Sequence, residues 1–237
     1  MFKLLQSKTK RFWLIFSSVF IATVFYQMAI NGVFAKERVS EEKQFVVQVS
    51  GSGKPVILIP GLMSSSAPTD IGPIISVDGL PFIGPVFTRT NATTVESLAG
   101  QAQQIKSMYN NMSQQQLIQQ SRYGLSIQAS SDEAKQQVMS MVETSDTKTV
   151  GDAIYTLMRH DLRQVIANIT SPVLLLGASG GFSTDEQKTA MQTLYAQQLV
   201  ALPSAELRMN TDSRHFVMLD DPMWLEEQVL TFLGTHL

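Results

Sequence analysis

The sequence predicts an α/β protein with a mostly parallel sheet, and three runs of apolar or β-rich residues carry this prediction. They cover residues 74–77, 173–176 and 205–209. The first two runs show no alternation of apolar and polar side chains, which is typical of strands that helices cover on both faces. Helical patterns separate the runs, as the crossover connections between parallel strands require.

Two further β-rich runs lie nearer the N-terminus, at residues 45–50 and 55–59. The four residues between them, 51–54, read Gly-Ser-Gly-Lys. A short glycine-rich connection between two strand patterns predicts an antiparallel hairpin with a flexible turn.

Two packing helices are predicted in the last quarter of the chain. Residues 183–186, Ser-Thr-Asp-Glu, have the spacing of a capping box. Asp221 precedes Pro222, and proline is favoured at the first helical position. An apolar stripe follows each start, as expected for one buried helix face. The stripes are Met191, Leu194, Tyr195, Leu199 and Leu202 in the first helix and Leu225, Val229, Phe232 and Leu233 in the second.

A helical insertion is predicted from about residue 88 to residue 158. Residues 95–158 contain no convincing strand but several helical patterns, such as residues 132–142 behind the cap residue Ser131. A helical block between strands can close over a site as a lid.

The first 35 residues predict a secretory signal. Basic residues from Lys3 to Arg11 precede an apolar stretch over 12–30, and Val-Phe-Ala ends the segment at Ala35. We favour cleavage after Ala35, with the domain over residues 36–237 periplasmic or secreted. The alternative is an uncleaved anchor in the inner membrane, because the apolar stretch approaches the roughly 20 residues that cross a bilayer.

Composition excludes several classes of function. Beyond residue 35 the chain has 14 basic and 20 acidic residues, so we expect no nucleic-acid partner and no attraction to an anionic membrane, leaving membrane contact to an uncleaved signal. The absence of cysteine excludes disulfides, thiolate nucleophiles and cysteine-ligated metals. Three scattered histidines without carboxylates at ligand spacing predict no metal site, and no cofactor is implied.

His215 is the most informative candidate for chemistry. It follows the strand pattern at 205–209 in a polar turn and precedes a capped helix. An imidazole at the carboxyl edge of a parallel sheet suits a general base. The alternative is a histidine in a surface turn, which is the interpretation we give to His160 and His236.

Several segments, taken in order, resemble the α/β-hydrolase family. They are PVILIPGLM at 55–63, ISVDGLPF at 75–82, PVLLLG at 172–177, RHF at 214–216 and DDPMW at 220–224, with the helical region between the second and third. The resemblance implies that fold with a helical lid, and hydrolysis of carboxylic esters or amides in a small acyl-type substrate by Ser-His-Asp chemistry. It places the catalytic histidine at His215, and the oxyanion amide at Leu62 with Met63 as a second donor.

The catalytic acid implied by the resemblance is Asp78. Most members carry the acid after the strand that corresponds to 173–176, but the turn there, Gly177 to Gly181, contains no acid before Asp185. Other members place it after the preceding strand, where Asp78 ends the run at 74–77. The alternative for Asp78 is an Asx turn that bonds the amides of the next two residues.

The nucleophile is where the sequence departs from the family. Residues 60–73 are too few for the strands, helices and G-x-S-x-G elbow expected there, since a single parallel crossover needs about a dozen residues or more. The sheet is therefore expected to be truncated and the activity is in doubt. Residues 177–181 fit G-x-S-x-G formally, but we interpret them chiefly as a glycine turn that needs positive φ.

Three functions follow from this departure. The first is a hydrolase of the family type. The second is a non-catalytic ligand-binding or truncated relative. The third is a rewired hydrolase that uses Ser179. The serine run at 64–66 is a weaker candidate for the attacking hydroxyl.

Overall fold

The structure is a computed structural model that describes residues 72–236 of the chain. The expected signal, the hairpin over 45–59, the serine run at 64–66 and the oxyanion residues Leu62 and Met63 lie outside the described residues and stay predictions.

Within the described residues the sheet has three parallel strands in the order β1-β2-β3, which confirms the predicted fold class. They are β1 Ile74–Val77, β2 Val173–Ala178 and β3 Glu206–Asn210. Val77 pairs with Leu176, and Leu176 pairs with Arg208 on the other side. Because the strands are parallel, their carboxyl ends meet at one edge of the sheet, where ligands of open α/β sheets bind.

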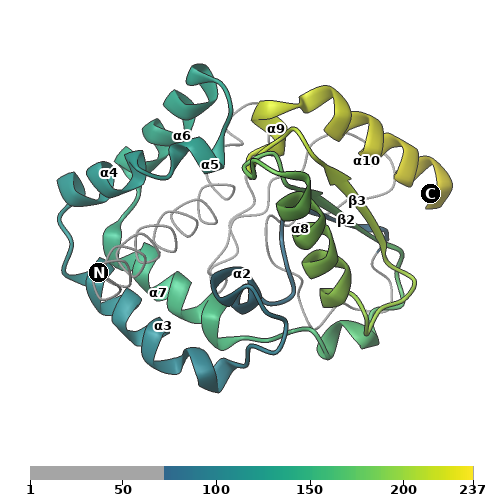
Figure 1. Cartoon of the computed structure of the whole chain (residues 1–237), viewed down its shortest axis with the longest axis horizontal. Helices are drawn as coiled ribbons and strands as arrows, with labels where there is room; N and C mark the ends of the chain where they lie inside the picture. Colours follow the sequence, from purple (N-terminus) through teal and green to yellow (C-terminus); the bar gives the residue numbers. More distant parts are fainter. Residues whose placement is uncertain (1–71, 237) are drawn as a thin grey trace, which may run out of the picture.

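Two helices cover the two faces of the sheet (Figure 1), namely α8 Asp185–Gln198 and α10 Pro222–His236. Val173 and Leu175 of β2 pack in a cluster with Leu194 of α8, whereas Leu174 and Leu176 pack with Phe232 of α10. Every residue of β2 is buried. Burial on both faces explains the unbroken apolar run that predicted this strand.

The starts of both helices are set by side-chain caps. Thr184 caps α8 and forms a capping box with Gln187, so the box lies one residue later than the predicted Ser183 to Glu186. The N–H of Trp224 donates to Oδ1 of Asp221 at 3.0 Å at the start of α10. Each cap satisfies a backbone donor that the first helical turn leaves without an intrahelical partner.

A helical block lies between β1 and β2 in the chain and to one side of the sheet (Figure 1). After the short α2 Gly84–Thr88, the block consists of α3 Val95–Asn110, α4 Gln114–Arg122, α5 Leu125–Gln128, α6 Asp132–Thr144 and α7 Thr147–Arg159. These helices occupy the region predicted to be helical, and the cap at Ser131 is present. The chain returns to β2 through the 3-10 helix Val165–Asn168.

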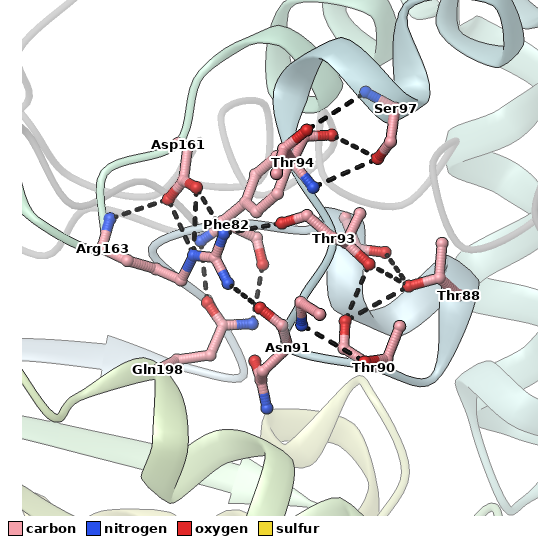
Figure 2. A network of polar contacts seen from close by, with 12 residues as sticks. Phe82, Thr88, Thr90, Asn91, Thr93, Thr94, Ser97, Asp161, Arg163 and Gln198 are labelled. Atoms are coloured by element: carbon pink, nitrogen blue, oxygen red, sulfur yellow. Dashed lines mark hydrogen bonds and ion pairs between the residues drawn. The ribbon is translucent and has the colours of Figure 1, made fainter.

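Arg163 ties the two ends of the helical block together (Figure 2). Its guanidinium pairs with Asp161 and donates to the carbonyl oxygens of Asn91 and Thr93 at 2.6 and 2.8 Å. The same group lies 4.9 Å from the centre of the Phe82 ring. One side chain therefore holds the segment that enters α3 beside the segment that leaves α7.

Gln198, the last residue of α8, bonds the backbone of Phe82 beside Arg163 (Figure 2). Its side-chain amide donates to the carbonyl of Phe82 at 2.8 Å and accepts from the N–H of Phe82 at 3.0 Å. Both residues are buried. A buried backbone needs such partners, so this pair fixes the segment after β1 against the helix that covers the sheet.

Candidate active site

Asp78 follows β1 directly and has an unusual backbone conformation. Its φ is 52°, in the left-handed region, and its N–H donates to the carbonyl of Leu176 at 2.6 Å. Aspartate tolerates this region better than most residues, but it still carries strain. Strain of this kind gathers at functional sites, so the backbone itself marks Asp78 as a candidate.

The carboxylate of Asp78 is buried and has partners from β2, from α8 and from the turn after β3. Oδ1 accepts from the N–H of Ala178 at 2.9 Å and from the hydroxyl of Tyr195 at 2.7 Å. Oδ2 lies 2.7 Å from Nδ1 of His215. An ionised carboxylate only accepts, so Nδ1 carries the hydrogen in this contact. Asp78 is 6% exposed, and a charge at such depth requires these donors.

The structure therefore brings the two predicted site residues, Asp78 and His215, into direct contact. The alternative Asx turn is absent among the described residues, because Asp78 bonds Ala178, Tyr195 and His215 and not the two amides that follow it. The turn after β1 is held instead by the hydroxyl of Ser76, which donates to the carbonyl of Gly79 at 3.0 Å.

His215 lies in the turn between β3 and the short helix α9 Val217–Asp220, as the sequence predicted. Oδ1 of Asn210 accepts from the N–H groups of Asp212 and Ser213 at 2.9 and 2.7 Å and so shapes the turn. The His215 side chain is 11% exposed, and its ring lies edge-on to Phe216. A side chain with so little exposure does not fit the alternative of an ordinary surface-turn histidine.

The helical block contacts the loop that carries His215. Nη1 of Arg214 donates to the carbonyl of Ala129 at 2.7 Å, and the N–H of Phe216 donates to the carbonyl of Gln128 at 3.0 Å. Asp220 accepts from both the N–H and the hydroxyl of Ser130, each at 2.8 Å. The loop between α5 and α6 is thus tethered to both sides of the candidate base.

Tyr195 is the member of the site that sequence reasoning missed. It was assigned to the packing stripe of α8, and its ring does pack there, but its hydroxyl reaches Asp78. Burial, and then the charge of Asp78 and the hydrogen bond to it, raise the pKa of Tyr195 well above its usual value. The phenol therefore stays protonated and donates. No local sequence signal separates such a tyrosine from one that only packs.

The turn after β2 supports the site without carrying a charge. The N–H of Ser179 donates to the carbonyl of Asn210 at 2.9 Å, and the N–H of Gly180 donates to the carbonyl of Ser213 at 2.8 Å. These bonds join the turn to the loop of His215. The Oγ of Ser179 is buried and has no hydrogen-bond partner among the described residues, so no bond links it to His215.

The turn needs a glycine at position 180 for space and none for positive φ, which corrects the sequence interpretation. None of Gly177, Gly180 and Gly181 has a backbone in the left-handed region. A Cβ at Gly180 would collide with the backbone carbonyl of Asp212 and lie 2.7 Å from the carbonyl oxygen of Ser213. Close approach of two loops explains this glycine.

The other two histidines lie away from Asp78. His160 ends α7, where Nδ1 contacts the carbonyl of Thr156 at 2.7 Å. His236 lies in α10, 3.5 Å from Glu206, and its ring is tilted by 60° against the ring of Phe232.

Two absences hold for residues 72–236, the part of the chain that the structure describes. That stretch contains no group of three or more histidine, aspartate or glutamate side chains placed to hold a metal ion. Within the same stretch, none of the helices combines the length and the apolar character that crossing a membrane requires.

Comparison with known proteins gives no match to any protein-family model and none to a curated protein. Among solved structures, 72 chains match. A hydrolase from Pseudomonas aeruginosa PA01 is 15% identical with a TM-score of 0.50, over 71% of this chain and 57% of that one. MenH from S. aureus is 13% identical with a TM-score of 0.54, over 70% and 59%.

A thermophilic esterase from Thermogutta terrifontis is 12% identical with a TM-score of 0.50, over 69% of this chain and 56% of that one. The chain spans more than half but less than two thirds of the length of these structures. At such low identity the likeness concerns the fold and not the activity. The chain has the α/β-hydrolase fold, as its sequence resemblance implied.

Proposed function

We propose that the chain hydrolyses carboxylic esters or amides, with His215 as general base and Asp78 as the carboxylate that orients it. The observation that carries the proposal is the 2.7 Å contact between Nδ1 of His215 and Oδ2 of a buried Asp78. The fold supports it, because a hydrolase and an esterase are among the solved structures of the same fold.

The contact with Asp78 assigns separate tasks to the two ring nitrogens. Nδ1 stays bonded to the carboxylate, which fixes the tautomer and stabilises the imidazolium that forms during the reaction. Nε2 then takes the proton of the attacking O–H group and returns it to the leaving oxygen or nitrogen. Such proton transfer contributes about 10²- to 10⁴-fold to the rate.

The proposal assigns the acid–base half of the reaction to the described residues. The oxyanion amides of Leu62 and Met63 and the attacking oxygen remain parts of the proposal that rest on the resemblance. The tethers between residues 128–130 and the loop of His215 support a further element of it, that the helical block closes over the substrate as a lid.

The first experiment measures covalent labelling of the folded chain by a fluorophosphonate probe together with turnover of p-nitrophenyl esters. We expect His215→Ala to lose about 10⁴-fold or more in turnover, since removing the base costs at least as much as removing the carboxylate that orients it. His160→Ala is the matched control, because it removes an imidazole away from Asp78, and it should keep full activity.

Mass spectrometry of the labelled chain then identifies the attacking hydroxyl. A label on a serine of the 64–66 run would place the nucleophile beside the expected oxyanion turn. Turnover without a label would make water the attacking group, activated by His215. A folded chain with neither label nor turnover would contradict the proposed function.

A further inference from the structure

We propose that Tyr195 is a positioning residue for the pair of Asp78 and His215, and that its hydroxyl both holds the carboxylate in place and limits the strength with which Oδ2 of Asp78 accepts from the imidazole. This inference rests on the proposed function, since it concerns the same acid–base pair. It assigns a task in the reaction to a residue of the packing stripe of α8.

The position of the Tyr195 hydroxyl is fixed by the sheet. The residue is 2% exposed, and its ring lies against the backbone of β2, since a Cβ at Gly177 would come within 2.8 Å of two ring atoms. The hydroxyl donates to Oδ1 of Asp78 at 2.7 Å. A ring held so closely has no room to withdraw its hydroxyl, because protein interiors are packed to crystal density.

The two oxygens of Asp78 have different partners. Oδ1 receives the hydroxyl of Tyr195 and the N–H of Ala178, whereas Oδ2 receives Nδ1 of His215. Two donors on Oδ1 stop rotation of the carboxylate and keep Oδ2 directed at the imidazole. They also draw negative charge towards Oδ1, which weakens the hold of Oδ2 on an imidazolium.

Of these two donors only Tyr195 can be changed by mutation, because the other is a backbone N–H. Removing the phenol hydroxyl leaves more charge on Oδ2, which favours the protonated imidazole. Other charged groups near the base are Asp212 and Arg214 on the same loop and Asp220 on α9, whose carboxylate accepts from the N–H of Arg214. Tyr195→Phe alters none of them.

The test compares Tyr195→Phe with Tyr109→Phe, which removes a phenol hydroxyl from the equally buried core of the helical block. In Tyr195→Phe we expect the rising limb of the pH–rate profile to move to higher pH by about half a unit to one unit. At pH values on the acid side of the limb, turnover should fall about three- to tenfold. It should recover at higher pH, and KM should stay unchanged. Tyr109→Phe should leave the profile in place.

A readout independent of activity is the NMR titration of the three histidines, with His215→Ala to assign the signal. The midpoint for His215 should move upward in Tyr195→Phe by the same amount. A merely structural tyrosine would lower stability and leave this midpoint unchanged, which would overturn the inference. If the wild-type chain hydrolysed no ester, the proposed function would fail, and the titration would still decide the role of Tyr195.

A second measurement keeps the phenol in place in case Tyr195→Phe does not fold. Replacing the five tyrosines with fluorotyrosine makes each phenol a stronger donor. The titration midpoint of His215 should then move to lower pH, opposite to the expected effect of Tyr195→Phe. A shift in the same direction as in Tyr195→Phe, or none, would contradict the inference.

Discussion

The turns after β1 and β2 leave the same edge of the sheet but have opposite compositions. The turn after β1 begins with Asp78, a charged residue in the left-handed region, whereas the turn after β2 is built from small uncharged residues, Ser179 to Gly181. The second turn approaches the loop of His215 so closely that Gly180 has no space for a side chain. One strand therefore supplies the charge, and its neighbour supplies the backbone that supports it.

Ala178 shows how the two turns depend on each other. Its N–H donates to Asp78, and the two residues after it bond the loop that carries His215. A negative charge in the turn after β2 would repel the buried carboxylate of Asp78, since like charges in close contact oppose ionisation. The turn after β2, residues 179–181, places no acidic side chain beside Asp78.

The first prediction compares the acid that follows β1, Asp78, with the first acid after β2, Asp185, by the loss of turnover when each becomes asparagine. Asp78→Asn should lower ester turnover by about 10⁴-fold, because the amide no longer holds the imidazole in the required tautomer. Asp185→Asn, the control, changes the first acid after β2 and should stay within a fewfold of wild type. Turnover kinetics of both variants decide the point, and the reverse order of effects would show that the acid belongs to β2.

The second prediction concerns the packing of the turn after β2. Gly180→Ala should lower the free energy of unfolding by about 3 kcal/mol, because the added Cβ meets the backbone of the loop of His215. Gly181→Ala is the matched control. Its Cβ would lie 3.4 Å from a side-chain methyl of Ile127, and we expect a change below about 1 kcal/mol. Urea unfolding measures both, and equal losses would refute the close approach.

The third prediction uses the raised pKa of Tyr195. In the folded chain the phenol keeps its proton above pH 10, whereas in the unfolded chain it releases it, so the folded state binds more protons and loses stability as pH rises. Full stability is present below pH 10, and above it the loss should be about 1.4 kcal/mol per pH unit relative to Tyr195→Phe.

Tyr109 also has a raised pKa, so it contributes equally to the stability curves of the wild type and of Tyr195→Phe. Subtracting one curve from the other therefore isolates the contribution of Tyr195. The quantity to measure is the difference between wild type and Tyr195→Phe in chemical unfolding between pH 9 and pH 11. Parallel curves over that interval would show that the phenol is not held protonated by burial beside Asp78.

The smallest expected effect is at Ser179. Its hydroxyl is buried without a partner among the described residues, so Ser179→Ala should leave stability unchanged or raise it by about 1 kcal/mol. Turnover should also stay at the wild-type level. A loss of activity equal to that of His215→Ala would instead revive the rewired hydrolase that the G-x-S-x-G match suggested.

The residue pattern alone determined much of this protein. Periodicity predicted the three described strands, both covering helices and the helical region, because burial on one or two faces leaves a direct imprint on which positions are apolar. Chain order and resemblance selected Asp78 and His215. Errors at this level were local, such as a capping box displaced by one residue.

The contacts that hold the candidate site together follow from the folded arrangement and have no counterpart in the residue pattern. The contacts of Asp78 with Ala178 and Tyr195 join residues about a hundred positions apart, and the tether from Ser130 to Asp220 spans ninety. Nothing in the local pattern distinguishes Tyr195 from a packing residue, or a glycine needed for space from one needed for φ. Such roles depend on which segments the packed sheet brings within hydrogen-bond distance, and periodicity along the chain carries no record of that distance.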